Sequence, residues 1–356
     1  MAPLSDLARA RALVLRHGWN ATAYQILNPG IRLWFRPDGD AVVGYVRSWR
    51  MWVVAGSPVC APDNLDAVAT AFEAEAARHG ARVCYFGADA PLRAIRAGRP
   101  GYSEMLVGAQ PAWDPADWPE IVSHKASLRA QRNRAVNKGV AVAEWAAGRA
   151  HDHPELRRCL AEWLRTRGLP AMRFLVETET LGRLLDRRMF VAERNGEAVA
   201  FLVASPIPAR QGWLVEQLVR GDRAPNGTAT LLLDAAMRAL AAEGASFVTL
   251  GLSPLSQRAP ADMENPLWLR ALLGWVRAHG KRFYNFEGLE AFKAKFVPDR
   301  WDPITALTNE PAPSLLTLHA TADAFSGEGR SPFAFVGRAL VEAVQKEART
   351  LGGLRG

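Results

Sequence analysis

The chain has 356 residues, 49% of them apolar and 22% charged, which is the composition of a globular protein and excludes a disordered or low-complexity chain. The formal net charge of +8 favours polyanionic partners such as tRNA, anionic lipid head groups or nucleotide phosphates. No run of 18 uncharged apolar residues occurs, so no transmembrane helix is predicted. Residues 1–18 are expected to form an amphipathic helix without a signal sequence, in a cytoplasmic protein of two domains.

The first third of the chain has the pattern of an α/β domain. Strands are predicted at residues 31–36 and 41–47, joined by the turn-forming sequence PDGD, and at 51–55. An Ala-rich amphipathic helix is predicted at 64–79, followed by a strand at 83–86. The resulting β–β–β–α–β order is that of a GNAT-like domain, and it also fits other α/β folds.

The middle of the chain is predicted to be mostly helical. Residues 120–138 are expected to form one basic helix, and a short strand follows at 140–145. Two further helices are expected at 154–167 and 177–187.

A second sheet is predicted to begin near residue 189. Strands at 189–194 and 197–205 form a predicted hairpin, because the Asn-Gly pair between them is a strong signal for a two-residue turn. A strand at 212–219, a helix at 228–243 and a strand at 247–252 complete the same β–β–β–α–β order as before. The predicted fold class is therefore α/β, with two tandem GNAT-like domains whose mixed central sheets are flanked by helices.

Four segments are expected along the chain. An N-terminal GNAT-like domain spans 1–118, a connecting basic helix spans 119–139, and a C-terminal GNAT-like domain that carries the chemistry spans 140–310. The remainder, 311–356, is expected to be an appendage with one amphipathic helix near 332–350.

Metal and thiol chemistry are not predicted. Cys60, Cys84 and Cys159 are widely spaced, form no Cys-x-x-Cys pair, and are expected to be buried thiols. The sequence His-Asp-His at 151–153 is explained as well by a polar turn before a helix as by a metal site.

The segment 220–228, between a predicted strand and a predicted helix, is a candidate anion-binding loop. In a GNAT fold the loop after the fourth strand and the start of the next helix hold the phosphates of the acyl donor, because free backbone N–H groups and the helix dipole attract anions. Arg220, together with Asn226, Gly227 and Thr228 at the start of the helix, suits this task. An ordinary surface loop with an N-capping residue is the alternative.

Lys293 and Lys295 lie two positions apart in the sequence, so they face different directions on a helix. One of them is expected to point into a site, where it would bind a phosphate or the oxyanion of a transferring ester or thioester. The alternative is a solvated basic helix in which Phe292 and Phe296 pack four residues apart.

A basic stripe is predicted on the helix at 120–138. Lys125, Arg129 and Arg132 follow one another at helical spacing, and no acidic residue occurs between 121 and 138. Such a stripe suits an RNA backbone or an anionic lipid, and a solvated helix face explains it as well.

Several segments resemble the phosphatidylglycerol lysyltransferase (MprF-like) family. The specific matches are LGLSPLS (250–256), YNFEGL (284–289), FKAKFVP (292–298) and WDP (301–303). Weaker matches are found at 55–59, 127–139, 218–220 and 225–227. The similarity extends from about residue 15 to residue 310.

This resemblance implies a tandem GNAT-like fold and the transfer of an aminoacyl group from aminoacyl-tRNA to a lipid hydroxyl, commonly that of phosphatidylglycerol. It implies that Arg220 binds a phosphate or sugar of the donor, and that Lys293 or Lys295 stabilises developing negative charge. Ser253 and Glu287 lie within the matching segments and are expected to take part in the site.

Two positions depart from the family pattern. Gln217 stands where the family has an acid three residues before the arginine, and Ala229-Thr230 stand where it has Met-Asp. A carboxylate there would suit a cationic amine, so its replacement implies a different aminoacyl group or a donor without an amine. Glu216 or Glu287 is expected to compensate for the lost charge.

Three functions are open on the sequence alone. The first is aminoacyl transfer from tRNA to a lipid or another small acceptor, without a cofactor. The second is N- or O-acyl transfer from an acyl-CoA or acyl-carrier-protein thioester through the same loop. The third is a non-catalytic tRNA- or membrane-binding module. Each fits peripheral contact with the inner face of the membrane, through residues 124–138 or the N-terminal helix.

Overall fold

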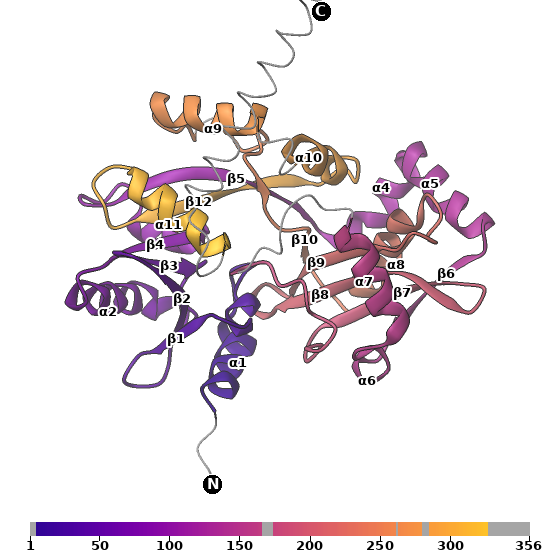
Figure 1. The fold of residues 1–356 in the computed structure, drawn as a ribbon, viewed down its shortest axis with the longest axis horizontal. Helices are drawn as coiled ribbons and strands as arrows, with labels where there is room; N and C mark the ends of the chain where they lie inside the picture. Colours follow the sequence, from indigo (N-terminus) through magenta and orange to yellow (C-terminus); the bar gives the residue numbers. More distant parts are fainter. Residues whose placement is uncertain (1–4, 166–173, 261–262, 280–284, 327–356) are drawn as a thin grey trace, which may run out of the picture.

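One twisted β-sheet runs through the whole molecule, and helices cover both of its faces (Figure 1). The computed structural model describes residues 5–165, 174–260, 263–279 and 285–326. Within these ranges the sheet has 12 strands, in the order β1-β2-β3-β4-β12-β5-β10-β9-β8-β7-β6, with β11 paired to β5 outside this path.

The elements agree with the sequence pattern in most of the chain. The strands are β1 Arg32–Phe35, β2 Val42–Ser48, β3 Met51–Ala55, β4 Arg82–Ala88, β5 Ser103–Trp113, β6 Val140–Trp145, β7 Arg188–Arg194, β8 Glu197–Ile207, β9 Gly212–Arg220, β10 Phe247–Thr249, β11 Ser253–Pro254 and β12 Arg300–Thr308. The helices are α1 Asp6–His17, α2 Leu65–Arg78, α3 Ala90–Arg96, α4 Trp118–His124, α5 Ala126–Asn137, α6 Ala147–Ala150, α7 Pro154–Arg165, α8 Thr228–Ala242, α9 Leu267–His279, α10 Phe286–Ala294 and α11 Leu315–Ser326. Short 3₁₀ turns lie at η1 Tyr24–Leu27, η2 Pro62–Asn64, η3 Pro115–Asp117 and η4 Pro208–Arg210.

The same unit occurs twice. In the first half, β1, β2 and β3 are antiparallel neighbours, α2 follows, and β4 lies parallel to β3. In the second half, β7, β8 and β9 are antiparallel neighbours, α8 follows, and β10 lies parallel to β9. The predicted tandem α/β architecture is therefore confirmed.

The last strand of the described residues belongs in space to the first half. Strand β12, which was not predicted as a strand and whose residues fall in the segment predicted as the second domain, is inserted between β4 and β5 and runs antiparallel to both. A division of the chain at residue 139 therefore does not separate the strands of the two halves completely. The halves are joined where β10 pairs with β5, through Val248 opposite Trp113.

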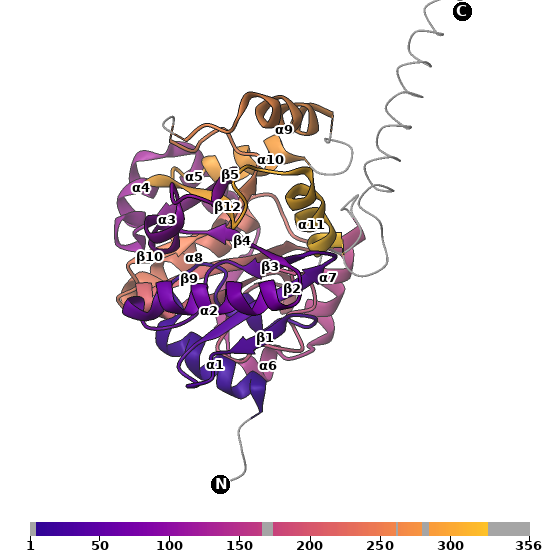
Figure 2. The same cartoon turned by 90° about the vertical axis from the view of Figure 1, so that its left-hand side faces the viewer.

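Helices seal both faces of each half. In the first half, α2 and α3 pack on one face, and α1, α9 and α11 contribute to the core on the other (Figure 2). In the second half, α4, α5 and α8 share one core, and α7 packs on the opposite face. The strands between these layers are almost wholly apolar, as expected for a sheet that is covered on both sides.

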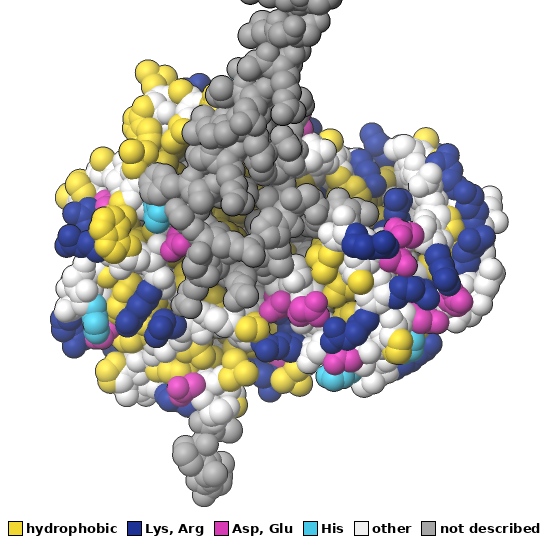
Figure 3. All heavy atoms as spheres, in the orientation of Figure 1, with side chains coloured by type: hydrophobic (Ala, Val, Ile, Leu, Met, Phe, Trp, Pro, Cys, Tyr) yellow, Lys and Arg dark blue, Asp and Glu magenta, His cyan; other side chains and the backbone are white. Residues whose placement is uncertain are grey.

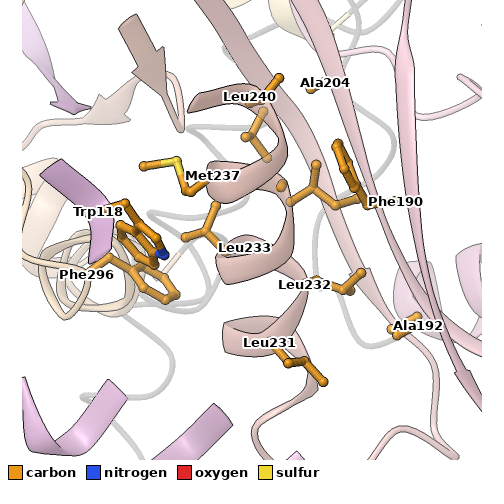
Figure 4. Close-up of a cluster of buried hydrophobic side chains, with 14 of the residues drawn as sticks. Trp118, Phe190, Ala192, Ala204, Leu231, Leu232, Leu233, Met237, Leu240 and Phe296 are labelled. Carbon is orange, nitrogen blue, oxygen red and sulfur yellow. The ribbon is translucent and has the colours of Figure 1, made fainter. Parts of the chain in front are cut away.

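Helix α8 is held between two groups of apolar side chains (Figure 4). On the sheet side it packs against Phe190 and Ala204, and on the other side against Trp118 and Phe296. All four of these side chains are buried. Because Phe296 directly follows the two predicted site lysines, this core fixes their position relative to the N-terminus of α8.

Three helix predictions need correction or lie outside the described residues. The helix predicted at 120–138 is broken at Lys125, where the backbone adopts φ −99° and ψ 92° between α4 and α5. Residues 177–187 form turns instead of a helix, because their polar groups bind β9, as described below. The helix predicted near 332–350 lies outside the described residues, and α11 was not predicted.

Candidate functional site

Strands β9 and β10 run parallel but pair only at their beginnings. Residues 212–214 pair with 247–249, after which β9 continues along β8 to Arg220. The chain after β10 turns away through Gly251, whose φ of 70° favours glycine, and re-enters the sheet as β11 beside β5. In the described residues the second part of β9 therefore has a strand neighbour on one side only, which leaves its other edge available to a ligand.

Lys293, near the end of α10, is buried beside this turn, with 5% of its surface exposed. Its Nζ donates hydrogen bonds to the carbonyl oxygens of Gly251, at 2.8 Å, and Leu252, at 2.9 Å. Burial lowers the pKa of Lys293 from 10.5 to about 7, because the charged form loses its hydration. Lys293 thus holds the segment at which β10 separates from β9, and its role in stabilising developing charge stays a prediction.

Arg220 and Lys295 form the exposed cationic part of the site. Arg220 ends β9, and its Nη1 lies 3.4 Å from Oδ1 of Asn226. The Nζ of Lys295 lies 4.2 Å from the ring centroid of Phe292 and 4.5 Å from that of Phe296. Burial against these rings, and then the positive charge of Arg220, lower the pKa of Lys295. Two neighbouring cations of this kind attract an anionic ligand.

The loop between β9 and α8 is shaped by its contact with α5. Gly227 has a φ of 101°, and a Cβ at this position would lie 2.1 Å from the carbonyl oxygen of Gln131. Thr228 is buried, and its Oγ1 donates to the carbonyl oxygen of Pro225 at 2.7 Å. Gly227 and Thr228 therefore shape the loop, while the N–H groups in the first turn of α8 present partial positive charge to an anion.

Glu216 is paired internally. Its two carboxylate oxygens each lie 3.2 Å from Nε of Arg187, and Nε2 of Gln25 donates to it at 2.8 Å. The side chains of Glu216 and Arg187 are only 7% and 5% exposed. Arg187 thus balances the charge of Glu216, so this carboxylate adds little net charge with which to compensate for a missing acid.

Gln217 is buried, and its carboxamide is fully used. The Nε2 group donates to the carbonyl oxygens of Glu177, at 2.9 Å, and Thr178, at 3.0 Å. Its Oε1 accepts from the hydroxyl of Thr180 at 2.8 Å. A carboxylate at this position would meet two carbonyl oxygens without a donor to offer them, which explains why an amide stands here.

Ser253 and Glu287 lie at different depths. Ser253 is buried in β11, directly after the Leu252 carbonyl that Lys293 binds, and its Oγ has no hydrogen-bond partner in the described part of the chain. Glu287 is exposed in the first turn of α10, at the opposite end of that helix from Lys293. The structure therefore groups Ser253 with Lys293 and places Glu287 farther along the same helix.

Two of the three residues of the predicted basic stripe have internal partners. Arg129 donates to the carbonyl oxygens of Val122, at 3.2 Å, and of Ser123, and so caps the end of α4. Arg132 lies 3.7 Å from the buried carboxylate of Asp234. Lys125 is exposed at the break between the helices. Other basic side chains still gather over α5, at the right of Figure 3, so this surface stays a predicted RNA- or phosphate-binding face.

The Arg187–Glu216 pair was missed by the sequence analysis. Arg187 lies in the segment predicted to be a helix, and its partner is 29 positions away on β9. A single long-range ion pair leaves no periodic signal in a sequence. Only the observation that 177–187 is not a helix would have directed attention to it.

The described residues contain neither a cluster of metal-binding side chains nor a membrane-spanning helix. In ranges 5–165, 174–260, 263–279 and 285–326, no three His, Cys, Asp or Glu side chains come together as a metal ion requires. Over the same residues, no helix has both the length and the apolar character needed to cross a bilayer. The three cysteines are buried free thiols.

The repeated β–β–β–α–β unit, with a diverging parallel strand pair in its second copy, defines a tandem GNAT-like α/β fold. Its structure is similar to that of the C-terminal domain (DUF2156) of a proposed lysylphosphatidylglycerol synthetase from Agrobacterium fabrum, with a TM-score of 0.77 and 24% identity over 92% of this chain and 98% of the other. It is also similar to L-PGS from Bacillus licheniformis, with a TM-score of 0.71 and 20% identity over 88% of this chain and 94% of that one.

The sequence comparison defines the family. The family model described as "Phosphatidylglycerol lysyltransferase, C-terminal" matches residues 11–305, so the chain belongs to this family. The phosphatidylglycerol lysyltransferase of Bacillus subtilis (strain 168) is 26% identical over 306 residues, which cover 83% of this chain and 34% of the relative. The chain thus spans about a third of that relative's length. The resemblance given above is confirmed.

Proposed function

We propose that this chain is an aminoacyltransferase that moves an aminoacyl group from aminoacyl-tRNA to the hydroxyl of a lipid head group such as phosphatidylglycerol. Family membership supports the class of reaction. The observation that carries the proposal is Arg220 at the end of β9, where this strand has a neighbour on one side only in the described residues and the guanidinium lies 3.4 Å from Asn226 in the loop before α8. Lys295 lies near enough for the charge of Arg220 to lower its pKa. Both proposed substrates contain phosphate, which such a group of positive charges attracts.

The proposed reaction is an exchange of esters. The lipid hydroxyl oxygen attacks the carbonyl carbon of the aminoacyl ester, and a new carbon–oxygen bond forms. The bond between that carbon and the ribose oxygen of tRNA then breaks, and the proton of the lipid hydroxyl passes to the ribose oxygen. No electrons are gained or lost, so the reaction needs positioning and stabilisation of the oxyanion and no redox cofactor.

Each cation has a distinct task in this proposal. The planar guanidinium of Arg220 suits a phosphate, to which it donates two parallel hydrogen bonds. Lys295, whose pKa is lowered by burial and by Arg220, supplies a second positive charge for the oxyanion or a second phosphate. Lys293 positions the 251–252 turn at the edge of this site.

The aminoacyl group is proposed to lack a cationic side chain. Gln217 is neutral and bound to the 177–180 segment, and the neighbouring Glu216 is balanced by Arg187. Neither offers an excess negative charge to a lysyl group. We therefore expect transfer of an aminoacyl group whose side chain is uncharged.

The test uses purified protein, total charged tRNA and vesicles that contain phosphatidylglycerol, with mass spectrometry of the lipids. The expected result is a new aminoacyl-lipid that disappears after RNase treatment and in the Arg220→Ala variant. Arg223→Ala is the matched control, because Arg223 lies in the same loop and pairs with Glu197 at 2.6 Å on the surface. Equal product from both variants would contradict the assignment of Arg220.

Two other outcomes would replace the proposal. Absence of product, together with thermal stabilisation of the protein by an acyl-CoA, would indicate a thioester-dependent acyltransferase that uses the same loop. Salt-sensitive binding of tRNA or lipid without any product would indicate a non-catalytic binding module.

A further inference from the structure

A buried polar cluster lies where the two halves meet, between η1 and the strands β8 and β9. Gln25 of η1 is 2% exposed, and its Nε2 donates to Oε1 of Glu216 at 2.8 Å and to Oγ of Ser205 at 3.2 Å. Ser205 is buried on β8, and Glu216 lies on β9. Three polar side chains from both halves are therefore held together away from bulk water.

The Oε1 atom of Gln25 is an unsatisfied acceptor. It is buried, and it has no hydrogen-bond partner in the described ranges. Its direction is set by Glu216, because a carboxylate only accepts hydrogen bonds, so the NH₂ group of Gln25 must face Glu216 and Oε1 must face away from it. A buried acceptor without a donor destabilises the folded protein, and in native structures it indicates a bound water, ion or ligand.

Glu216 offers a second acceptor beside Gln25. Its Oε1 accepts from Gln25 and Arg187, whereas the only partner of its Oε2 among the described residues is Nε of Arg187, at 3.2 Å. A carboxylate can accept about four hydrogen bonds, so Oε2 has capacity for another donor. Because Arg187 balances the charge of Glu216, a ligand here is recognised through its N–H groups and not through an excess of opposite charge.

A β-bulge places Glu216 at the open edge of β9. The register between β8 and β9 shifts at this point, and no residue of β8 stands opposite Glu216. An extra residue of this kind redirects its side chain, and bulges are frequent next to binding sites. Leu214 is the last residue of β9 that pairs with β10, so the bulge follows directly on the separation of these two strands.

We propose that Gln25 and Glu216, supported by Ser205, bind the α-amino group of the aminoacyl donor. An amine supplies several N–H donors, and the two acceptors with free capacity are Oε1 of Gln25 and Oε2 of Glu216. Arg220 lies four residues farther along β9, which is roughly 13 Å at about 3.3 Å per residue. The ribose and ester of an aminoacyl nucleotide bridge such a distance between amine and phosphate. The inference rests on the proposed function for the identity of the donor, and it deepens that function by naming the group that is recognised.

Recognition of an amine would separate aminoacyl esters from acyl thioesters as donors. An acyl-CoA with a simple fatty acyl chain has no α-amine, so it would leave Oε1 of Gln25 without a partner. A site built to bind N–H groups rejects analogues that lack them, because its buried acceptors then stay unpaired. Since every aminoacyl group has an α-amine, the cluster defines the class of donor and leaves the side chain open.

Two small probes test the proposal without any transfer reaction. L-alaninamide has an α-amine next to a carbonyl group, and propionamide is the same molecule without the amine. In ligand-observed NMR titrations of the full chain, L-alaninamide is expected to bind at least about tenfold more tightly than propionamide. Gln25→Met, which removes the acceptor from a side chain of similar length, is expected to lower this ratio about tenfold. Equal or absent binding of the two probes to the wild type would overturn the proposal and leave a water molecule as the partner of Gln25.

A second variant guards against a folding defect of Gln25→Met, which thermal unfolding would reveal. Ser205→Ala removes one of the two acceptors that orient Gln25, so the preference for L-alaninamide is expected to fall about threefold. Ser48→Ala is the matched control, because Ser48 is also buried in a strand and donates to Asp323 at 2.6 Å in the first half. An unchanged preference in both serine variants, with Gln25→Met folded and also unchanged, would overturn the proposal.

A blocked donor separates the amine proposal from the proposed function. The wild type is expected to use N-acetyl-aminoacyl-tRNA at least about tenfold less efficiently, as kcat/KM, than the unblocked aminoacyl-tRNA. Equal use of the two donors would overturn amine recognition while it supports aminoacyl transfer. Selective binding of L-alaninamide that depends on Gln25, without transfer to any lipid, would support amine recognition and refute the proposed function.

Discussion

The two halves of the molecule share one topology but treat their parallel strand pair differently. In the first half, β3 and β4 pair along residues 51–55 and 82–86, the full length of β3. In the second half, β9 and β10 pair over only three residues before they separate. The edge of β4 is moreover covered by β12, whereas β9 ends in the exposed Arg220.

The loops that follow β3 and β9 also differ, and the loop after β3 is closely packed. Gly56, directly after β3, is packed so closely that a Cβ there would lie 2.4 Å from Oγ1 of Thr22. Ser57 then donates to Asp89 at 3.1 Å, and the loop at residues 56–64 contains no Lys or Arg. The two halves therefore share the same scaffold. Of the two, only the second combines parallel strands that separate, β9 and β10, with an exposed positive charge at the end of β9.

The largest effect on transfer is expected from Lys293→Met, which acts where β10 separates from β9. The variant leaves the Gly251 and Leu252 carbonyls without their donor, so the 251–252 turn loses its position, and we expect transfer to fall about 100-fold or more. The free energy of unfolding should change by less than about 2 kcal/mol. The removal of a buried charge stabilises the folded state, and this offsets the loss of the two hydrogen bonds. Arg50→Met, in the exposed turn between β2 and β3, is the control for the loss of an exposed cation. Full activity of Lys293→Met would show that the strand separation does not depend on this residue.

The pH dependence of stability gives an independent measure of the same lysine. The pKa of Lys293 is about 7 in the folded protein and higher when the chain unfolds, so between about pH 7 and pH 10 the unfolded state binds more protons. The free energy of unfolding of the wild type, relative to Lys293→Met, should therefore rise as the pH rises through this window. Chemical denaturation at several pH values measures the free energy of unfolding of both proteins. If the difference between them does not change with pH, Lys293 is in a hydrated environment.

A smaller effect is expected from Lys295→Met. The ammonium lies over the rings of Phe292 and Phe296, which the methionine side chain also contacts, so the fold should survive. Loss of one of two exposed cations should weaken donor binding about tenfold, mainly as a higher KM. Steady-state kinetics with charged tRNA at low and moderate salt measures this change. A lower kcat at unchanged KM would instead assign Lys295 to the oxyanion.

The smallest effect on transfer is expected in the first half, from Asp89→Asn. Because Asp89 accepts a hydrogen bond from Ser57 within the first half, transfer should change by no more than about twofold. Burial raises the pKa of Asp89 from 3.8 to about 6, so between these values the folded state binds more protons and wild-type stability falls as the pH rises. The variant should lose this part of the pH dependence in thermal unfolding scans. A large loss of transfer would show that both halves take part in catalysis.

The sequence predicts the repeated elements well because their signals are local. The apolar runs of the strands, the Asn-Gly turn before β8 and the apolar periodicity of α8 are each contained within about 15 residues. The link between Arg220 and Lys295 is different, since they are far apart in the sequence and were connected only by the family resemblance. The structure brings the two cations together, and their roles remain predictions.

What the sequence did not predict depends on contacts between distant segments. The break at Lys125 is stabilised by Arg129, which binds the end of α4, and residues 177–187 are drawn into turns by Gln217. To predict the insertion of β12 between β4 and β5, one must know which strands have an unpaired edge, and the sequence does not show this. Helix α9, Leu267–His279, was not predicted, because its apolar residues lie on several sides instead of on one face.

The position of β12 has a consequence for the synthesis of the protein. Ser103 of β5 and Thr308 of β12 are partners, although they are 205 positions apart in the chain. At ordinary rates of translation, about 10–40 s separate their appearance, and during that time β4 and β5 expose unpaired edges. The sheet of the first half is therefore completed only after β12 has been synthesised. A chain that ends before residue 300 should aggregate instead of folding as an independent half.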